Sequence, residues 1–143
     1  MNNLSKIIYN EKAGLAHSDV RRSIYDPSNL FEGLENYSWI PHNIIKINEA
    51  GLQLGNHYHP YEELFFTPTG GFRFLLAEED NNIIKDYQLG EGARIYIPKN
   101  VVHRVTGEKG AIIMGWGTEE FNPKKMISGS QEVLKKFDKY ILK

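Results

Sequence analysis

The chain has 143 residues, 41% of them hydrophobic and 24% charged, which is the size and composition of a single globular domain covering residues 1–143. The net charge is −1 with both signs interspersed, so we expect no nucleic-acid partner. The absence of cysteine excludes disulfides, zinc-thiolate sites and thiol nucleophiles.

The N-terminal part of the chain predicts short strands separated by loops. Its first residues, Met-Asn-Asn-Leu-Ser-Lys, lack an apolar signal region, and no apolar run is long enough to span a membrane, so we expect a cytoplasmic protein with no membrane partner. Strands are expected at 5–10, 21–25 and 39–48, a loop at 11–20, and a helical turn at 28–34.

The central part of the chain predicts a series of closely spaced strands with turn residues between them. These strands are expected at 52–59, 63–66, 72–77, 83–89, 93–97, 101–106 and 111–117. Turn signals such as Thr67-Pro-Thr-Gly-Gly71 and Gly90-Glu-Gly92 separate them. Many short strands with such turns are typical of an all-β sandwich or barrel.

The tail predicts an α-helix at about residues 129–142. Ser128 and Gln131 have the spacing of a capping box. The apolar residues that follow recur at helical intervals: Val133, Leu134, Phe137, Tyr140 and Ile141. We expect this helix to lie on the barrel or against a second subunit.

The segment Gly-Asn-His-Tyr-His at 55–59 contains the strongest chemical signal in the chain. On an extended strand, His57 and His59 point to the same face, and Glu63 follows four residues later. Imidazole and carboxylate groups are suitable ligands for a divalent first-row metal. The segment therefore predicts either a metal site or a polar cluster on a strand.

Two longer patterns resemble the two motifs of the cupin superfamily. Residues 51–70 resemble the first motif, with Gly51, His57, His59, Glu63 and Gly70 at the matching spacing. Residues 92–107 resemble the second, from Gly92 through Pro98 to His103. Asn100 and Gly107 depart from the glycine and asparagine that are usual at those positions.

The resemblance implies a double-stranded β-helix, or jelly-roll, barrel, to which the periodicity of the tail adds a C-terminal helix. It also implies one divalent transition metal, which could be Fe, Mn, Ni, Zn or Cu, bound by His57, His59, Glu63 and His103. A homodimer is implied as well.

A second resemblance is to sugar-nucleotide cupins, the deoxysugar 3,5-epimerases and keto-isomerases. It rests on Gly-Asn-His-Tyr-His, on Asp19-Val-Arg-Arg22 and on Tyr96-Ile-Pro98 followed by a histidine. Arg22 replaces a usual glycine, and Leu54 stands where an arginine is frequent. Many of these enzymes use no metal, and the resemblance implies that His57 is a general base.

Three further residues are candidates for the site. Tyr96 is a candidate catalytic residue, and Arg94 and Trp116 are candidates for substrate binding. Arg94 and Tyr96 share one face of their strand, so Arg94 would hold a substrate carboxylate or phosphate if that face points inward. His17 and His42 lie outside both motifs and are interpreted as structural or exposed.

Three functions remain open from the sequence. The first is a metal-dependent enzyme, of isomerase, epimerase or dioxygenase type, acting on a small polar or sugar-like molecule. The second is a metal-free sugar-nucleotide epimerase or isomerase with His57 as base. The third is a cupin that binds a small molecule without catalysis.

Overall fold

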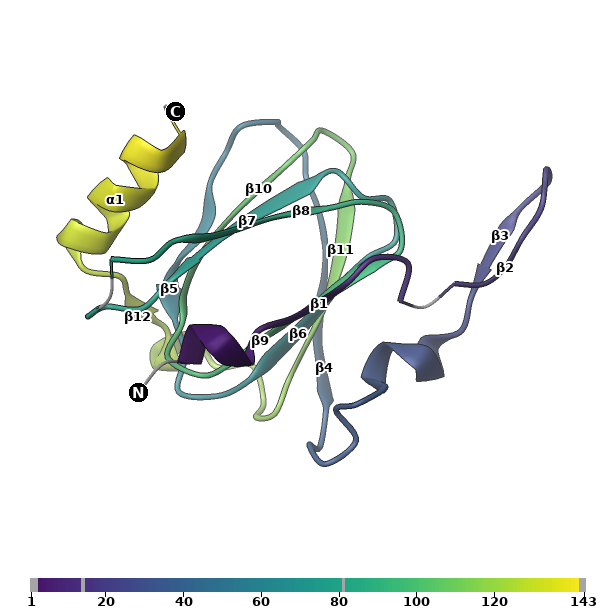
Figure 1. Cartoon of the computed structure of the whole chain (residues 1–143), viewed down its shortest axis with the longest axis horizontal. Helices are drawn as coiled ribbons and strands as arrows, with labels where there is room; N and C mark the ends of the chain where they lie inside the picture. The colour runs from purple at the N-terminus through teal and green to yellow at the C-terminus, as the bar shows by residue number, and fades with distance from the viewer. Residues whose placement is uncertain (1–2, 14, 81, 142–143) are drawn as a thin grey trace.

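Two five-stranded antiparallel sheets face each other and enclose the main hydrophobic core (Figure 1). The computed structural model describes residues 3–13, 15–80 and 82–141. The first sheet contains, in order, β1 (Ile8–Asn10), β9 (Ala93–Ile97), β6 (Glu63–Thr67), β11 (Ile112–Gly117) and β4 (Ile40–Lys46). The second contains β12 (Ile127–Ser128), β5 (Leu54–Tyr58), β10 (Val102–Gly107), β7 (Phe72–Ala77) and β8 (Lys85–Leu89). This arrangement confirms the predicted all-β fold class.

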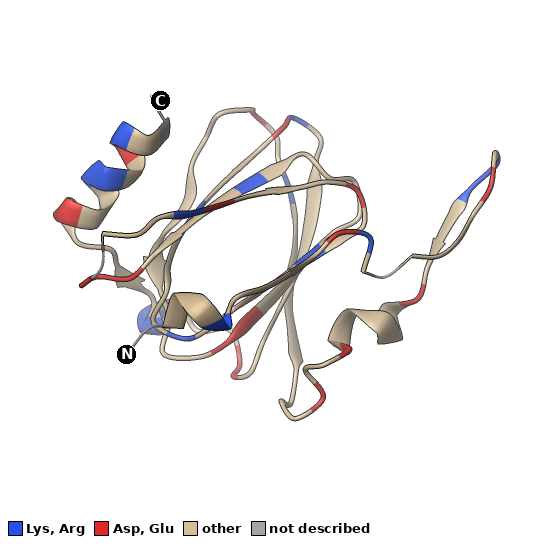
Figure 2. Ribbon diagram, in the orientation of Figure 1, with Lys and Arg blue, Asp and Glu red and all other residues tan. Residues whose placement is uncertain are grey.

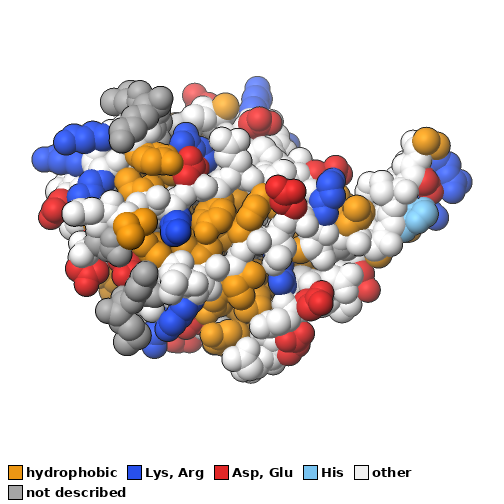
Figure 3. All heavy atoms as spheres, in the orientation of Figure 1, with side chains coloured by type: hydrophobic (Ala, Val, Ile, Leu, Met, Phe, Trp, Pro, Cys, Tyr) orange, Lys and Arg blue, Asp and Glu red, His pale blue; other side chains and the backbone are white. Residues whose placement is uncertain are grey.

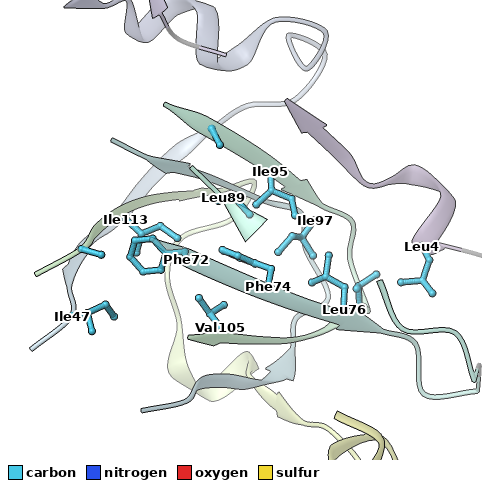
Figure 4. Packing of buried hydrophobic residues seen from close by; sticks show 13 residues of the cluster. Leu4, Ile47, Phe72, Phe74, Leu76, Leu89, Ile95, Ile97, Val105 and Ile113 are labelled. Atoms are coloured by element: carbon cyan, nitrogen blue, oxygen red, sulfur yellow. The ribbon is translucent and has the colours of Figure 1, made fainter. Parts of the chain in front are cut away.

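The core lies between the sheets because alternate residues of each strand point inward. In β7, Phe72, Phe74 and Leu76 belong to the central cluster, while Leu75 points outward. Figure 4 shows Phe74 and Ile97 among the side chains that fill the space between the two sheets. The predicted strand 83–89 begins only at Lys85, and Ile83 and Ile84 precede it without regular structure.

The C-terminal helix α1 (Gln131–Ile141) covers the outer face of the second sheet. Its fully buried Val133 and Phe137 pack on outward-facing side chains of β7 and β10, and each such burial stabilises the fold by about 1.5–3 kcal/mol. The predicted cap is wrong by two residues: Ser130, not Ser128, accepts the N–H of Val133 through its side chain. Residue 142, the predicted end, lies outside the described residues.

Outside the barrel, β2 (Leu15–Ser18) and β3 (Ser23–Tyr25) form a hairpin that projects away from the two sheets (Figure 1). The prediction of a loop over 11–20 is therefore wrong. Strand β2 contains few large apolar residues, so its sequence alone gives no strand pattern. It is extended because it pairs with β3. Val20 at the tip is fully exposed, and Ile24 is 40% exposed.

Three 3₁₀ turns complete the described chain: η1 (Asn3–Lys6), η2 (Pro27–Phe31) and η3 (Pro123–Lys125). The segment around η2 covers the outer face of the first sheet through a cluster that includes Leu34, Leu64 and Tyr96. Figure 2 shows charges of both signs on α1 and on the projecting hairpin. None of the described helices has the length and apolar character needed to span a membrane.

Candidate active site

The pairing of β5 with β10 brings His57 and His103 together. The two residues are direct partners in the antiparallel register, and their ring centroids lie 4.7 Å apart. Gly55 makes this approach possible, because a Cβ at that position would lie 2.6 Å from the backbone oxygen of His103. Gly55 also has φ +86°, which L residues with side chains rarely adopt.

His59 and Glu63 complete the cluster. The His59 ring lies 4.6 Å from that of His57, and both His59 and Glu63 are buried. Glu63 Oε1 lies 3.1 Å from His59 Nε2 and 3.6 Å from His103 Nε2. The structure therefore brings together all four residues that the sequence predicted as metal ligands.

The surroundings favour the uncharged forms of His57 and His103 and the ionised form of Glu63. Burial, with His103 and His59 nearby, lowers the pKa of His57 to about 4. Burial also lowers the pKa of His103. Burial alone would raise the pKa of Glu63, but the hydrogen bond from His59 and the neighbouring imidazoles bring it below its ordinary value. His57 is thus neutral at pH 7 and able to accept a proton.

The cluster opens into a cavity of about 210 Å³ between the two sheets. Polar groups are supplied mainly by the histidines and Glu63, and most of the remaining wall is apolar. The apolar lining residues are Ile45, Leu54, Phe65, Val105, Ile113, Phe121 and Met126. The volume is below the roughly 300–1,000 Å³ usual for drug-sized ligands, so it suits a ligand part the size of one sugar ring.

A larger groove of about 840 Å³ lies near the opposite end of the strands, among turns that include Gly71, Gly90 and Gly107. It is shallower than the histidine cavity, and none of the predicted site residues lines it. Nearby, Figure 3 shows hydrophobic side chains on the surface between β1 and β8. In that region the rings of Tyr9 and Tyr87 lie 5.3 Å apart. We place the chemistry in the smaller cavity because the titratable cluster is there.

The structure does not bring Arg94, Tyr96 and Trp116 to this cavity. Strand parity pairs Tyr96 and Trp116 with Leu64, whose side chain lies on the outer face of the first sheet. Arg94 shares that face with Tyr96. The sequence predicted the shared face, but which face points inward depends on how the whole sheet packs.

These outward residues anchor the N-terminal segment instead. Arg94 is only 7% exposed and donates to Leu30 O at 2.7 Å and to Asn10 Oδ1 at 2.9 Å. The Tyr96 hydroxyl donates to Glu62 at 3.1 Å. Burial, followed by the hydrogen bond with a neighbouring tyrosine, raises the pKa of Tyr96. Both contacts are those of buried structural side chains.

Two polar residues of β4, His42 and Asn43, line the cavity and were not predicted as site residues from the sequence. Gly115 pairs with Asn43, but the next residue of β11, Trp116, pairs with Pro41, so His42 is an extra, bulged residue. Because of the bulge, the consecutive residues His42 and Asn43 both face the cavity. His42 Nε2 lies 2.7 Å from Glu119 O, which can only accept, so this nitrogen carries a proton.

Gly117 is the sequence signal that could have located His42. A Cβ at Gly117 would lie 2.2 Å from the His42 ring, so only glycine leaves room for the imidazole. Glycines at 115 and 117, both in one strand, indicate close approach of a neighbour. The identity of that neighbour is visible only once β4 and β11 are paired.

The three imidazoles fit a divalent transition metal. Among the described residues, ligand atoms of His57, His59 and His103 lie within 4.8 Å of one another. His103 Nδ1 lies 3.3 Å from Val101 O, which accepts its proton and leaves the Nε2 lone pair available. Histidine ligands usually donate their second ring N–H in this way. Glu63 lies outside this group of three and contacts His59 instead.

No protein-family model matches the sequence, and no curated protein matches it either. Solved structures do match the fold. A dTDP-4-dehydrorhamnose 3,5-epimerase from Bacillus anthracis, with TDP and PPi bound, superposes with a TM-score of 0.72 and 18% identity, covering 88% of this chain and 79% of that chain.

Two ketoisomerases match over nearly their whole length. A TDP-quinovose 3,4-ketoisomerase from Campylobacter jejuni has a TM-score of 0.61 and 16% identity, covering 90% of this chain and 97% of that one. A sugar 3,4-ketoisomerase from Thermoanaerobacterium thermosaccharolyticum, in complex with TDP, has a TM-score of 0.64 and 13% identity, covering 96% and 98%. At these identities the similarity establishes a shared fold.

Proposed function

Because the chain has the cupin jelly-roll fold found in sugar-nucleotide epimerases and ketoisomerases, we propose that it isomerises or epimerises a keto sugar linked to a nucleoside diphosphate, with His57 as the general base. The observation that carries the proposal is the position of His57, which lines a sugar-sized cavity beside His59 and His103. Burial there lowers the pKa of His57 to about 4. This is the alternative that the second sequence resemblance implied, and it now takes precedence over the metal-dependent reading.

The chemistry requires a base beside the carbon next to a carbonyl. A neutral ring nitrogen of His57 takes a proton from that carbon, the C–H electron pair forms a carbon–carbon double bond, and the carbonyl electron pair moves onto oxygen. In an epimerisation, a proton returns from the imidazolium, or from water after exchange, to the same carbon and the carbonyl re-forms. In a ketoisomerisation, the enolate oxygen takes up a proton, the neighbouring hydroxyl loses one to become the new carbonyl, and a proton is added to the former carbonyl carbon. In both cases as many protons return as leave, so the reaction balances without an oxidant or reductant.

The rest of the cluster sets the state of the base. His103 is hydrogen-bonded to Val101 O, and His59 is held by Glu63, so both rings have a fixed orientation. Ionised Glu63 also favours the imidazolium that forms during proton transfer. In this proposal the cavity takes one ring of the substrate, and the nucleotide part stays outside it, on the side of the exposed lining residue Phe121.

A metal-dependent enzyme is the second candidate, because the three imidazoles form a suitable donor set. His57, His59 and His103 would hold the ion, with Glu63 orienting His59. A divalent metal bound there supplies a Lewis acid for a carbonyl or hydroxyl oxygen. Elemental analysis separates the candidates: about one metal per chain, lost in His103→Ala, supports this one.

The direct test of the proposed function is solvent exchange. A dTDP-linked 4-keto-6-deoxy sugar incubated with the protein in D₂O should gain deuterium next to the carbonyl, followed by NMR or mass spectrometry. His57→Asn should lower the rate by about 10²–10⁴-fold. If several such sugars show no exchange but raise the melting temperature, the protein is a binding cupin and not an isomerase.

The predicted homodimer is also a proposal. The projecting β2–β3 hairpin is the segment best placed to contact a second copy, because Val20 and Ile24 are exposed apolar side chains away from the barrel. Analytical ultracentrifugation of the protein and of a Val20→Asp, Ile24→Asp variant tests this. A dimer that becomes a monomer in the variant supports it, and an unchanged dimer contradicts it.

A further inference from the structure

Strand β4 provides a polar wall across the cavity from His57, and no role has been assigned to it. Asn43 lies on the first sheet, while His57 and His103 lie on the second, and all three line the same cavity. The bulge at His42 is what keeps Asn43 paired with Gly115 on the inner face. A bulge beside a site commonly redirects a side chain.

The Asn43 side chain is unusual because neither end has a hydrogen-bond partner among the described residues. Its oxygen is buried and lies against Gly115, where a Cβ would come within 3.0 Å of it. A buried, unpartnered amide costs roughly 1–3 kcal/mol, and such groups in native structures often have a functional reason. The amide nitrogen is not fully buried, and it belongs to a residue that lines the cavity.

Proton removal by His57 creates negative charge on the substrate oxygen. A keto group becomes an enolate, and a preorganised N–H donor aimed at that oxygen stabilises it. The lining residues that carry polar side chains are the four histidines, Glu63 and Asn43. Among these, His42 Nε2 is occupied by Glu119 O, and His59 Nε2 by Glu63. Among the described lining residues, Asn43 Nδ2 is therefore a neutral donor without a partner, on the opposite sheet from the base.

We propose that Asn43 is a catalytic residue that donates a hydrogen bond from Nδ2 to the keto oxygen of the substrate and to the enolate oxygen formed when His57 removes the neighbouring proton. The inference rests on the proposed function. The proposed role also gives a reason for the bulge in β4. Without the extra residue at His42, the consecutive side chains of His42 and Asn43 would point to opposite faces of the strand and could not both line the cavity.

Two variants test the direction of the hydrogen bond. Asn43→Leu removes the donor and the unpartnered oxygen together, and Asn43→Asp keeps the shape but can only accept. Both should lower kcat for the keto sugar nucleotide by about 10²–10³-fold, with KM changed by less than about threefold. The Leu variant should keep or raise the melting temperature, because an unsatisfied polar group is lost. Asn36→Leu, at an exposed position, is the matched control and should keep wild-type kcat.

The outcomes separate the two proposals. If wild-type protein catalyses exchange and Asn43→Leu keeps kcat within about threefold, the role of Asn43 is overturned while the proposed function stands. Wild-type kcat in Asn43→Asp overturns a donor role in the same way. A lower melting temperature with activity lost only in proportion to unfolding assigns Asn43 to stability instead. If wild-type protein itself shows no exchange, the proposed function fails and this assignment fails with it.

Discussion

Substituting Gly55 by alanine tests whether close approach of β5 and β10 builds the site. The added Cβ would lie 2.6 Å from His103 O and 3.2 Å from the His103 ring, and backbone atoms cannot move aside as a flexible side chain can. The positive φ of +86° alone costs an alanine about 1–2 kcal/mol. The steric overlap adds about 1–3 kcal/mol.

Gly110→Ala is the matched control, because Gly110 has the same φ of +86° but no atom within 4 Å of an added Cβ. Urea unfolding should show a larger loss of unfolding free energy for Gly55→Ala, by about 1–3 kcal/mol. Exchange activity should fall more than tenfold in Gly55→Ala alone, since His57 and His103 are pushed apart. Equal losses of stability in the two variants, with activity kept in both, would refute the reasoning.

Three further outcomes follow from the structure. As the pH is lowered, kcat/KM for exchange should begin to fall near pH 4, because the lowered pKa keeps His57 deprotonated down to about that pH. A pH–rate profile in which kcat/KM already falls near pH 6.5 would contradict this prediction. Tyr96→Phe should lower the free energy of unfolding in urea by about 1 kcal/mol, because the hydroxyl loses its hydrogen bonds with Glu62 and Tyr37. Its kcat should stay unchanged, and a large fall in kcat would show that Tyr96 belongs to the active site. Phe137→Ala should cost about 3–5 kcal/mol, measured the same way, because the ring is fully buried, and a loss under 1 kcal/mol contradicts the docking of α1.

The central cluster could be predicted from the sequence because its residues are set by local spacing. His57 and His59 share a strand-like segment, Glu63 follows after a short turn, and His103 follows a recognisable Gly-to-Pro interval. The structure brings these four together. The strand series and the C-terminal helix were predicted for the same reason, since alternation and helical periodicity are local patterns.

What could not be predicted depends on packing between distant segments. Because alternate residues of a strand point to the same side, Arg94 and Tyr96 could be predicted to share one face of the sheet. That this face is the outer one could not be predicted, because the N-terminal segment that covers it lies more than 60 residues away in the chain. The bulge that admits His42 and Asn43 exists only in the pairing of β4 with β11. Ser130 replaced Ser128 as the helix cap because the turn geometry, and not the spacing alone, decides which hydroxyl reaches the free N–H groups.

The most direct test of the account is deuterium uptake by a dTDP-linked 4-keto-6-deoxy sugar in D₂O, comparing wild-type protein with His57→Asn after metal has been removed with a chelator. We predict that the metal-free wild type exchanges the proton next to the carbonyl and that His57→Asn, equally folded by circular dichroism, is slower by about 10²–10⁴-fold. Exchange that needs added metal, or that continues unchanged in His57→Asn, would contradict His57 as a metal-free base.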